Sequence, residues 1–311
     1  MLLSITAMIR VFIFFILSLI SLPEGSKNNL SCFDYWATQE PVISFGLLTD
    51  VQYCNCEPEG TRFYNHSASK LREAILDFNN QNLQFVISLG DLIDRDFVSY
   101  DTVMPIMQSS LHPLYYVLGN HEFSVESSDR KRVMERLGME KPYYSFVIQN
   151  FRFIILDSND ICVYSPDRRK RAEAGRMIEN LIETEQIDAF NYAGVIGEEQ
   201  KEWFINELDE SVISDQIVLI FSHHTLFPES RHNLLNHKEI LDIVAEYENI
   251  TTWFCGHNHE GDYGNFSLIH FVNSRGMVET TDQNSYAVIE LYHNKIWIKG
   301  RGREKSMILA Y

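Results

Sequence analysis

The stretch FVISLGDLIDR, residues 85–95, places two carboxylates directly after an apolar run. Strands that are buried in an open α/β sheet read as continuous apolar runs, and ligands bind beyond their carboxyl ends. Loops at that end carry chemistry on a rigid base. The stretch therefore predicts a buried strand followed by a candidate site that contains Asp91 and Asp94.

Four more apolar runs end in residue types that bind metals. They are VISFGLLTDVQ (42–52), with Asp50 and Gln52; LYYVLGNHE (114–122), with Asn120 and His121; IVLIFSHH (217–224), with His223 and His224; and TTWFCGHNH (251–259), with His257 and His259. Two divalent cations about 3.5–4 Å apart need a bridging carboxylate, further oxygen and imidazole donors, and room for a hydroxide. A single Asp after a strand is more often a turn or a helix cap. Together, however, these endings favour a dinuclear metal site.

The segments between these runs have helical periodicity. In SASKLREAILDFNN (67–80), apolar residues recur at the spacing of an amphipathic helix that lies on a sheet, and EEQKEWFINELDE (198–210) and HKEILDIVAEYEN (237–249) repeat the pattern. Later in the chain, SLIHFVN, YAVIELYH and KIWIKGRG follow one another without helices between them. Alternating strands and helices followed by consecutive strands predict two mixed sheets packed face to face and flanked by helices.

The order of the motif blocks carries a resemblance. D-x-(H/Q), GDxxD, GNHE, a His after a strand and GHxH occur in the order that is typical of the calcineurin-like metallophosphoesterase superfamily. Most members have a second His where this chain has Gln52. With NYAGVIGEEQKEWF, GMVETTDQNSYAVIEL and IKGRGRE, the chain is similar to the manganese-dependent ADP-ribose/CDP-alcohol diphosphatase family from about Ile43 to about Arg303. The fold implied is an α/β protein with a four-layer α/β/β/α sandwich.

The resemblance also implies roles for individual residues. One metal would be held by Asp50, Gln52, Asp91 and His259, and the other by Asp91, Asn120, His223 and His257, so that Asp91 is the bridge. His121 resembles the catalytic His that acts near the leaving group as a proton donor or electrostatic stabiliser. Asp94 is expected to orient Asn120 or His121. His224 is expected either to pack behind the ligand His223 or to face the substrate.

The activity implied is hydrolysis of compounds linked through a nucleoside diphosphate, such as ADP-ribose, CDP-choline and other CDP-alcohols. The products would be a nucleoside monophosphate and a phosphorylated sugar or alcohol. Two divalent metals are expected, with Mn²⁺ favoured over Fe and Zn because Gln52 makes one donor set richer in oxygen, and with Mg also possible. Three alternatives stay open: another phosphoesterase of this superfamily, acting on cyclic nucleotides or phospholipids; a non-catalytic binding scaffold; and a metal-storage or structural protein. A scaffold would be expected to have lost ligands.

Composition agrees with a single large catalytic domain, expected over residues 27–311. The chain has 311 residues, is 45% hydrophobic and shows no repeats. Its formal charge of -17 argues against a nucleic-acid partner and against docking on an anionic membrane. The resemblance implies a small-molecule nucleotide as the partner. Residues 160–193 are charge-rich and are predicted to be a helical insertion. Charge runs usually face water, but Arg168, Arg169 or Arg171 could instead contact a substrate phosphate.

The first 26 residues have the layout of a signal peptide: a weakly basic start, the apolar run Val11–Ile20, and a small, polar end. Secretion or periplasmic export without stable membrane association is therefore expected. An uncleaved N-terminal membrane anchor is the alternative, although the apolar run is short for a span. Among five cysteines, Cys54 and Cys56 are expected to be too close in sequence to pair easily, and Cys255 is expected to be buried packing.

Overall fold

Two six-stranded sheets form the centre of the protein. The computed structural model describes residues 40–183 and 192–311, and Pro41–Tyr311 forms one compact unit. The strands are β1 (Ile43–Leu48), β2 (Phe85–Ser88), β3 (Leu114–Tyr116), β4 (Tyr144–Ile148), β5 (Phe151–Ile155), β6 (Ile217–Phe221), β7 (Ile250–Cys255), β8 (Asp262–Phe266), β9 (Ile269–Asn273), β10 (Ser285–Leu291), β11 (Lys295–Gly302) and β12 (Met307–Ala310). The predicted signal peptide, 1–26, lies outside the described residues.

The strand order places the motif strands side by side. One sheet runs β12-β11-β10-β1-β2-β3 and the other β4-β5-β6-β7-β9-β8. Strands β1, β2 and β3 are parallel, as are β5, β6, β7 and β9, while the remaining pairs are antiparallel. Each sheet is therefore mixed, with parallel strands where the motifs lie. The carboxyl ends of those strands point to one edge of their sheet.

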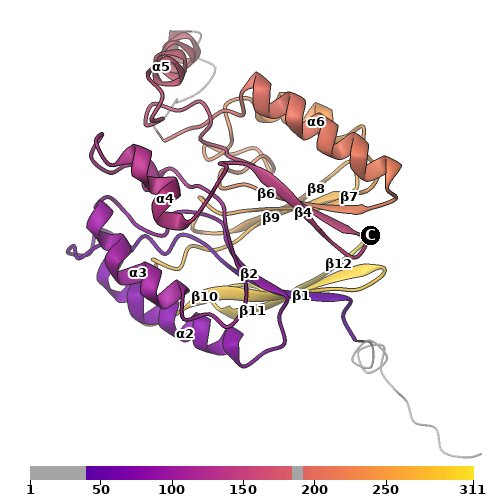
Figure 1. Ribbon diagram of the computed structural model, residues 1–311, viewed down its shortest axis with the longest axis horizontal. Helices are drawn as coiled ribbons and strands as arrows, with labels where there is room; N and C mark the ends of the chain where they lie inside the picture. Colours follow the sequence, from indigo (N-terminus) through magenta and orange to yellow (C-terminus); the bar gives the residue numbers. More distant parts are fainter. Residues whose placement is uncertain (1–39, 184–191) are drawn as a thin grey trace, which may run out of the picture. The chain divides into compact units, whose positions relative to one another are not determined.

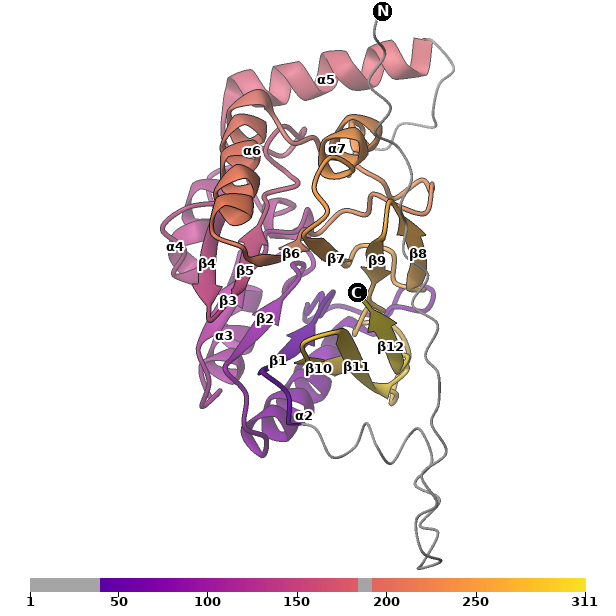
Figure 2. The same cartoon turned by 90° about the vertical axis from the view of Figure 1, so that its right-hand side faces the viewer.

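Helices cover the outer faces of both sheets (Figures 1 and 2). Leu71, Ala74 and Phe78 of α2 are buried in one apolar cluster that also contains residues from the first sheet. Phe204 and Ile240 are buried in another, together with strand residues of the second sheet. The α-helices are α2 (Ser67–Asn79), α3 (Tyr100–Met107), α4 (Val133–Leu137), α5 (Arg168–Glu183), α6 (Glu198–Ile213) and α7 (His237–Val244).

Six phenylalanines lie in the apolar core between the sheets, among a larger number of aliphatic side chains. Phe45 of β1 stacks on Phe85 of β2 with ring centroids 4.7 Å apart, and it meets Phe153 of β5 edge-on at 6.0 Å. Phe221 and Phe254 stack on the second sheet at 5.5 Å. Offset-stacked and edge-to-face rings at such distances are the favoured aromatic arrangements. The predicted α/β/β/α sandwich is confirmed, with one apolar layer that joins the two sheets.

The charged region 160–193 contains helix α5; residues 184–191 are outside the description. Arg168 and Arg169 are exposed, as expected of a charge run that faces water. Within the described parts of the chain, no helix is both long enough and apolar enough to cross a membrane.

Candidate metal centre

The candidate ligands come from loops that directly follow parallel strands of both sheets. Loops after β1, β2 and β3 carry Asp50, Gln52, Asp91 and Asn120, and loops after β6 and β7 carry His223, His257 and His259. All seven residues are buried, with at most 9% of their surface exposed. We call this set the floor: Asp50, Gln52, Asp91, Asn120, His223, His257 and His259.

One half of the floor surrounds Gln52. The amide Nε2 of Gln52 lies 3.2 Å from Asp91 Oδ2 and 3.2 Å from His259 Nε2. His259 Nε2 is in turn 3.2 Å from Asp50 Oδ1. A half-turn of the Gln52 amide exchanges its nitrogen and oxygen. Oε1, an atom that can bind a metal, would then lie beside Asp91 Oδ2 and His259 Nε2.

The other half surrounds His223. Its Nε2 lies 3.1 Å from Asp91 Oδ2, 3.2 Å from Asn120 Oδ1 and 3.2 Å from His257 Nδ1. The same oxygen, Asp91 Oδ2, thus borders both halves of the floor. A carboxylate in this position can bridge two cations.

The donor atoms have the spacing and chemistry of metal ligands. Ligands about 2.1 Å from an octahedral cation lie roughly 3 Å apart along each edge. Gln52 Oε1, the atom that the half-turn brings to the floor, is buried and makes no hydrogen bond with the described residues. An unpaired buried polar group is costly, and a cation would satisfy it. Burial, together with the neighbouring imidazoles, lowers the pKa of His257 well below its usual value, so it is neutral, the form that binds metals.

Four floor residues have strained backbones. Asp50, Gln52, Asp91 and His257 have φ angles of 50°, 41°, 55° and 69°. Residues other than glycine rarely adopt positive φ, and such strain persists where the surroundings over-determine it. Such a backbone conformation costs of order 1–3 kcal/mol per residue. The packing of the floor therefore fixes the positions of these side chains even though the backbone is strained.

Glycines and a buried glutamate shape the same loops. A Cβ on Gly119 would come within 2.1 Å of Asp91 Oδ1, so a side chain at position 119 would displace the bridging carboxylate. Glu122 accepts hydrogen bonds from the backbone N–H groups of Asp91 (2.8 Å), Leu92 (2.6 Å) and Gly119 (2.8 Å). Sequence reasoning assigned Glu122 no role, although it ends the GNHE block. The structure shows that it ties the loops after β2 and β3 together.

Two floor histidines are oriented through their second ring nitrogen. His223 Nδ1 lies 2.8 Å from the carbonyl oxygen of Leu89, and His259 Nδ1 lies 2.7 Å from Glu279 Oε1. Burial alone would raise the pKa of Glu279, but the hydrogen bond from His259 helps to hold it down at about 2. Carboxylates of this kind raise ligand basicity and fix the ring. Glu279 was also missed, although it lies in the stretch GMVETTDQNSYAVIEL, which carried part of the resemblance.

His121 borders the floor from the solvent side. Its Nδ1 lies 2.7 Å from the backbone oxygen of Asp94 and 3.2 Å from Asp94 Oδ1, and its backbone N–H donates to Asp91 Oδ1 at 2.8 Å. Burial opposes the charged imidazole, but the carboxylates of Asp91 and Asp94 outweigh it and raise the pKa of His121 to about 9. The ring is thus held as a proton donor, with Asp94 placed against it.

His224 does not face the substrate side. Its Nδ1 lies 2.8 Å from Ser158 Oγ and its Nε2 lies 2.7 Å from the backbone oxygen of Tyr192, so both ring nitrogens have partners. The residue is fully buried, and burial lowers its pKa to about 3. Of the two expectations for His224, packing behind the ligand fits the structure, and a direct contact with substrate does not.

A cavity of about 320 Å³ opens above the floor. The floor residues Gln52, Asn120, His257 and His259 line it, and His121 lines it beside them. We call the remaining lining residues the rim: Arg62, Ser124, Tyr164, Tyr192, Arg231 and His232. None of the insertion arginines, Arg168, Arg169 or Arg171, lines this cavity, and Arg171 donates to the backbone oxygen of Ser165 instead.

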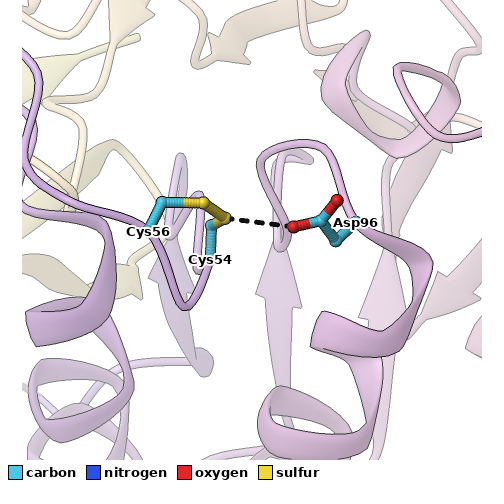
Figure 3. A group of neighbouring side chains, drawn as sticks. All are labelled: Cys54, Cys56 and Asp96. Atoms are coloured by element: carbon cyan, nitrogen blue, oxygen red, sulfur yellow. Dashed lines mark hydrogen bonds between the residues drawn. A yellow bond between two sulfur atoms is a disulfide. The ribbon is translucent and has the colours of Figure 1, made fainter.

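The expectation that Cys54 and Cys56 stay unpaired is wrong. A disulfide joins them, because the loop after β1 turns so that their Cα atoms are 5.1 Å apart, within the range that a disulfide spans. Figure 3 shows the bond beside Asp96, whose Oδ2 lies 3.4 Å from Cys54 Sγ. Bonded sulfurs offer no thiolate to a metal. Cys255 is buried and free, as predicted for a packing residue.

The fold and the donor set define a metallophosphoesterase, and residues 43–261 match the family model of calcineurin-like phosphoesterases. The chain belongs to this family. The resemblance to this family, which the five motif blocks indicated, is therefore confirmed.

Named relatives cover nearly the whole chain. The chain is 27% identical to a human protein named manganese-dependent ADP-ribose/CDP-alcohol diphosphatase, over 88% of this chain and 94% of the relative. A zebrafish protein of the same name is 28% identical, over 88% and 99%. Among solved structures, a dimetal phosphatase from Danio rerio is 27% identical, with a TM-score of 0.79 over 88% of this chain and all of that one.

Proposed function

We propose that this chain is a dinuclear, Mn²⁺-dependent hydrolase of small molecules linked through a nucleoside diphosphate. The observation that carries the proposal is the position of Asp91 Oδ2, which borders both the Gln52 half and the His223 half of the floor. The relatives named manganese-dependent ADP-ribose/CDP-alcohol diphosphatase support diphosphate-linked nucleotides as the substrate class. ADP-ribose and CDP-choline are the substrates we expect, with a nucleoside monophosphate as one product of each.

The proposed ligand sets follow the two halves of the floor. Asp50, Gln52, Asp91 and His259 would hold one cation; Asp91, Asn120, His223 and His257 would hold the other. When bound, the cations supply Lewis-acid polarisation of phosphoryl oxygens and a water acidified to a nucleophile near neutral pH. Gln52 makes the first donor set three oxygens and one nitrogen, which suits Mn²⁺ better than Zn²⁺.

The chain's own residues supply the proton and its placement. Asp94 fixes Nδ1 of His121, so Nε2 is the nitrogen that can donate a proton to the departing oxygen. Glu122 keeps the loops of Asp91 and His121 together, and Glu279 keeps His259 in one orientation. The cavity above the floor has a volume of about 320 Å³, which is the size of a small-molecule site and suits a small nucleotide.

A substrate panel tests this function. Initial rates with ADP-ribose, CDP-choline, cyclic AMP and bis(p-nitrophenyl) phosphate would be measured side by side with Mn²⁺, and products separated by anion exchange. Preference for the first two, with AMP and CMP as products, is expected. Preference for cyclic AMP would instead support the second candidate, which is favoured by 20% identity over 72% of this chain to a Haemophilus influenzae cyclic-AMP phosphodiesterase.

We also propose that residues 1–26 direct export and are removed, on the layout of that segment alone. Expression without them should give active enzyme in the host cytoplasm. Mass analysis of exported full-length protein should show a new N-terminus near residues 21–27. An intact Met1 on membrane-bound protein would favour the anchor alternative.

A further inference from the structure

We propose that Lys70 is a positioning residue for one cation of the metal pair, the one in the half of the floor that surrounds Gln52. The inference rests on the proposed dinuclear function. Lys70 lies on α2, is only 3% exposed, and is not among the residues that line the cavity. Its ammonium group acts through residues 276–280, the segment that carries Glu279.

The ammonium group of Lys70 is fully used by backbone oxygens. Its Nζ donates to the carbonyl oxygens of Met277, Glu279 (2.9 Å) and Thr280 (3.0 Å). A lysine ammonium has three N–H donors and no acceptor, so three carbonyls satisfy it. Burial, with Arg303 nearby, lowers the pKa of Lys70 to about 8. An apolar side chain would fill the same place without burying a charge, which indicates that the ammonium is needed at these carbonyls.

Lys70 supplies partners that no neighbouring strand supplies. Residues 276–280 lie between β9 and β10 and belong to neither strand. The oxygen of Val278 accepts from the N–H of Phe63 at 3.0 Å, and Lys70 takes the other three carbonyls of 277–280. Thr280 has a φ of 66°, which is unusual for a β-branched residue and persists only where its surroundings hold it. Without the ammonium, three buried carbonyls would lose their partner.

The same segment contacts two floor residues that belong to one proposed ligand set. The N–H of Val278 donates to the backbone oxygen of Asp50 at 2.9 Å, and the N–H of Gly276 donates to that of His259 at 3.2 Å. Glu279 Oε1 lies 2.7 Å from His259 Nδ1 and orients the ring. A shift of this segment should therefore loosen the cation held by Asp50 and His259 more than the other one.

A purely structural role is the competing explanation, because Lys70 could serve only to keep α2 in place. The two roles predict different results. A structural lysine, once removed, should lower Tm and leave metal binding by the folded protein unchanged. A positioning lysine should change the binding of one cation even at temperatures where the protein is fully folded.

The test titrates metal-stripped wild type and Lys70→Met with Mn²⁺ and follows the free ion by electron paramagnetic resonance. Methionine fills the space of the lysine stem and removes the donors. The dissociation constant of one of the two bound ions should rise roughly 10–100-fold, as is typical when an outer partner of a metal ligand is lost. The other constant should stay close to its wild-type value. With Mn²⁺ in excess, kcat for ADP-ribose should recover, since Lys70 does not line the cavity.

Lys201→Met is the matched control. Lys201 is 6% exposed and lies on α6, where it pairs with Glu198 and Glu239. Its loss removes a buried ammonium of similar exposure, so it should lower Tm without changing either Mn²⁺ constant. Lys70→Arg keeps the charge and the donors and should restore part of the affinity that Lys70→Met loses.

A double variant tests the route through Glu279. Glu279→Gln alone should weaken the same cation, because His259 loses its carboxylate partner. If Lys70 acts through this residue, Lys70→Met/Glu279→Gln should lose less affinity than the product of the two single losses. Independent effects would multiply, and that result would contradict the route.

The outcomes separate the inference from the function on which it rests. Unchanged Mn²⁺ constants in a Lys70→Met protein that is folded by circular dichroism, or equal losses at both sites, overturn the role of Lys70 while the dinuclear function stands. If Lys70→Met does not fold, Lys70→Gln, whose amide keeps two donors, is titrated in its place, and a smaller loss at the same single site is expected. A wild type that binds fewer than two Mn²⁺ overturns both.

Discussion

The floor and the rim of the cavity are built by different means. Every floor side chain is buried and follows directly after a parallel strand, and four of them have strained φ angles. Rim side chains come from longer loops, and they are half-buried or exposed. The difference indicates that the ends of the sheet strands fix the floor, which would carry the chemistry, whereas loops hold the rim, which would contact the rest of the bound molecule. Substitutions in the two regions should therefore fail in different ways.

The largest effect is expected at the bridge. Asp91→Ala should remove both cations and reduce turnover to background, because one oxygen borders both halves of the floor. Metal content by plasma mass spectrometry and ADP-ribose hydrolysis would be measured together. Asp101→Ala, which removes an exposed carboxylate paired with Arg136, is the control.

If Asp91→Ala does not fold, Asp91→Asn keeps the size and allows the same measurement, with circular dichroism as a check of folding. Two bound cations and near-normal turnover in a folded variant would show that Asp91 is not the bridge.

The next largest effect is expected at His121, which borders the floor without belonging to either ligand set. His121→Ala should keep its metals, and turnover on ADP-ribose should fall by roughly 10²–10⁴-fold, as for a lost proton-transfer group. The loss should be smaller on bis(p-nitrophenyl) phosphate, because p-nitrophenolate leaves without a proton. Since the acid must be protonated to act, the fall of kcat at high pH in wild type should also disappear. Loss of metal alongside activity would make His121 a ligand.

The floor could be predicted from sequence, and the rim could not. Asp50, Asp91, Asn120 and the three histidines each follow a buried strand within a few residues, so local pattern was enough to find them. Glu122 and Glu279 act through partners that are close in space, and nothing beside them in sequence says which atoms they contact. Rim residues such as Arg62 and Tyr192 meet only because distant loops converge, which no local pattern records.

The same reason explains what was missed in the fold. The buried motif strands and helices α2, α6 and α7 were predicted, whereas strands β4, β8 and β12 were not. All three lie at sheet edges, and their residues are mostly half-buried or exposed. Of these edge strands, β8 (DYGNF) lacks the apolar run of a central strand, whereas β4 and β12 are short apolar runs that no motif follows.

A smaller effect is expected for Gln52→His, which exchanges one floor donor for another without changing the charge of the site. The change makes the donor set two oxygens and two nitrogens, which should tighten Zn²⁺ binding and weaken activation by Mn²⁺. Titrating metal-stripped wild type and variant with each ion would show the shift as crossing activation curves. Identical curves would mean that Gln52 is not a ligand but an outer hydrogen-bond partner.

The smallest effect is expected at the Cys54–Cys56 disulfide, which lies between the floor and the rim in sequence. Cys54 packs with Tyr64 and Val278 in a small apolar cluster. Because the bond closes a ring of only three residues, chain entropy suggests a stabilisation of about 1.5 kcal/mol, or a few degrees in Tm. Reduction should therefore lower Tm slightly.

Metal content should not change on reduction, since the floor is held by the strand ends and by Glu122 and Glu279, and kcat/KM for ADP-ribose should fall by less than about threefold. The double variant Cys54→Ser/Cys56→Ser should behave like the reduced enzyme and should be indifferent to reductant, which excludes effects through the buried thiols of Cys162 and Cys255. Release of a cation on reduction would contradict the division between floor and rim. The loop after β1 would then have to be regarded as a single unit, in which the position of Gln52 depends on the disulfide two residues away.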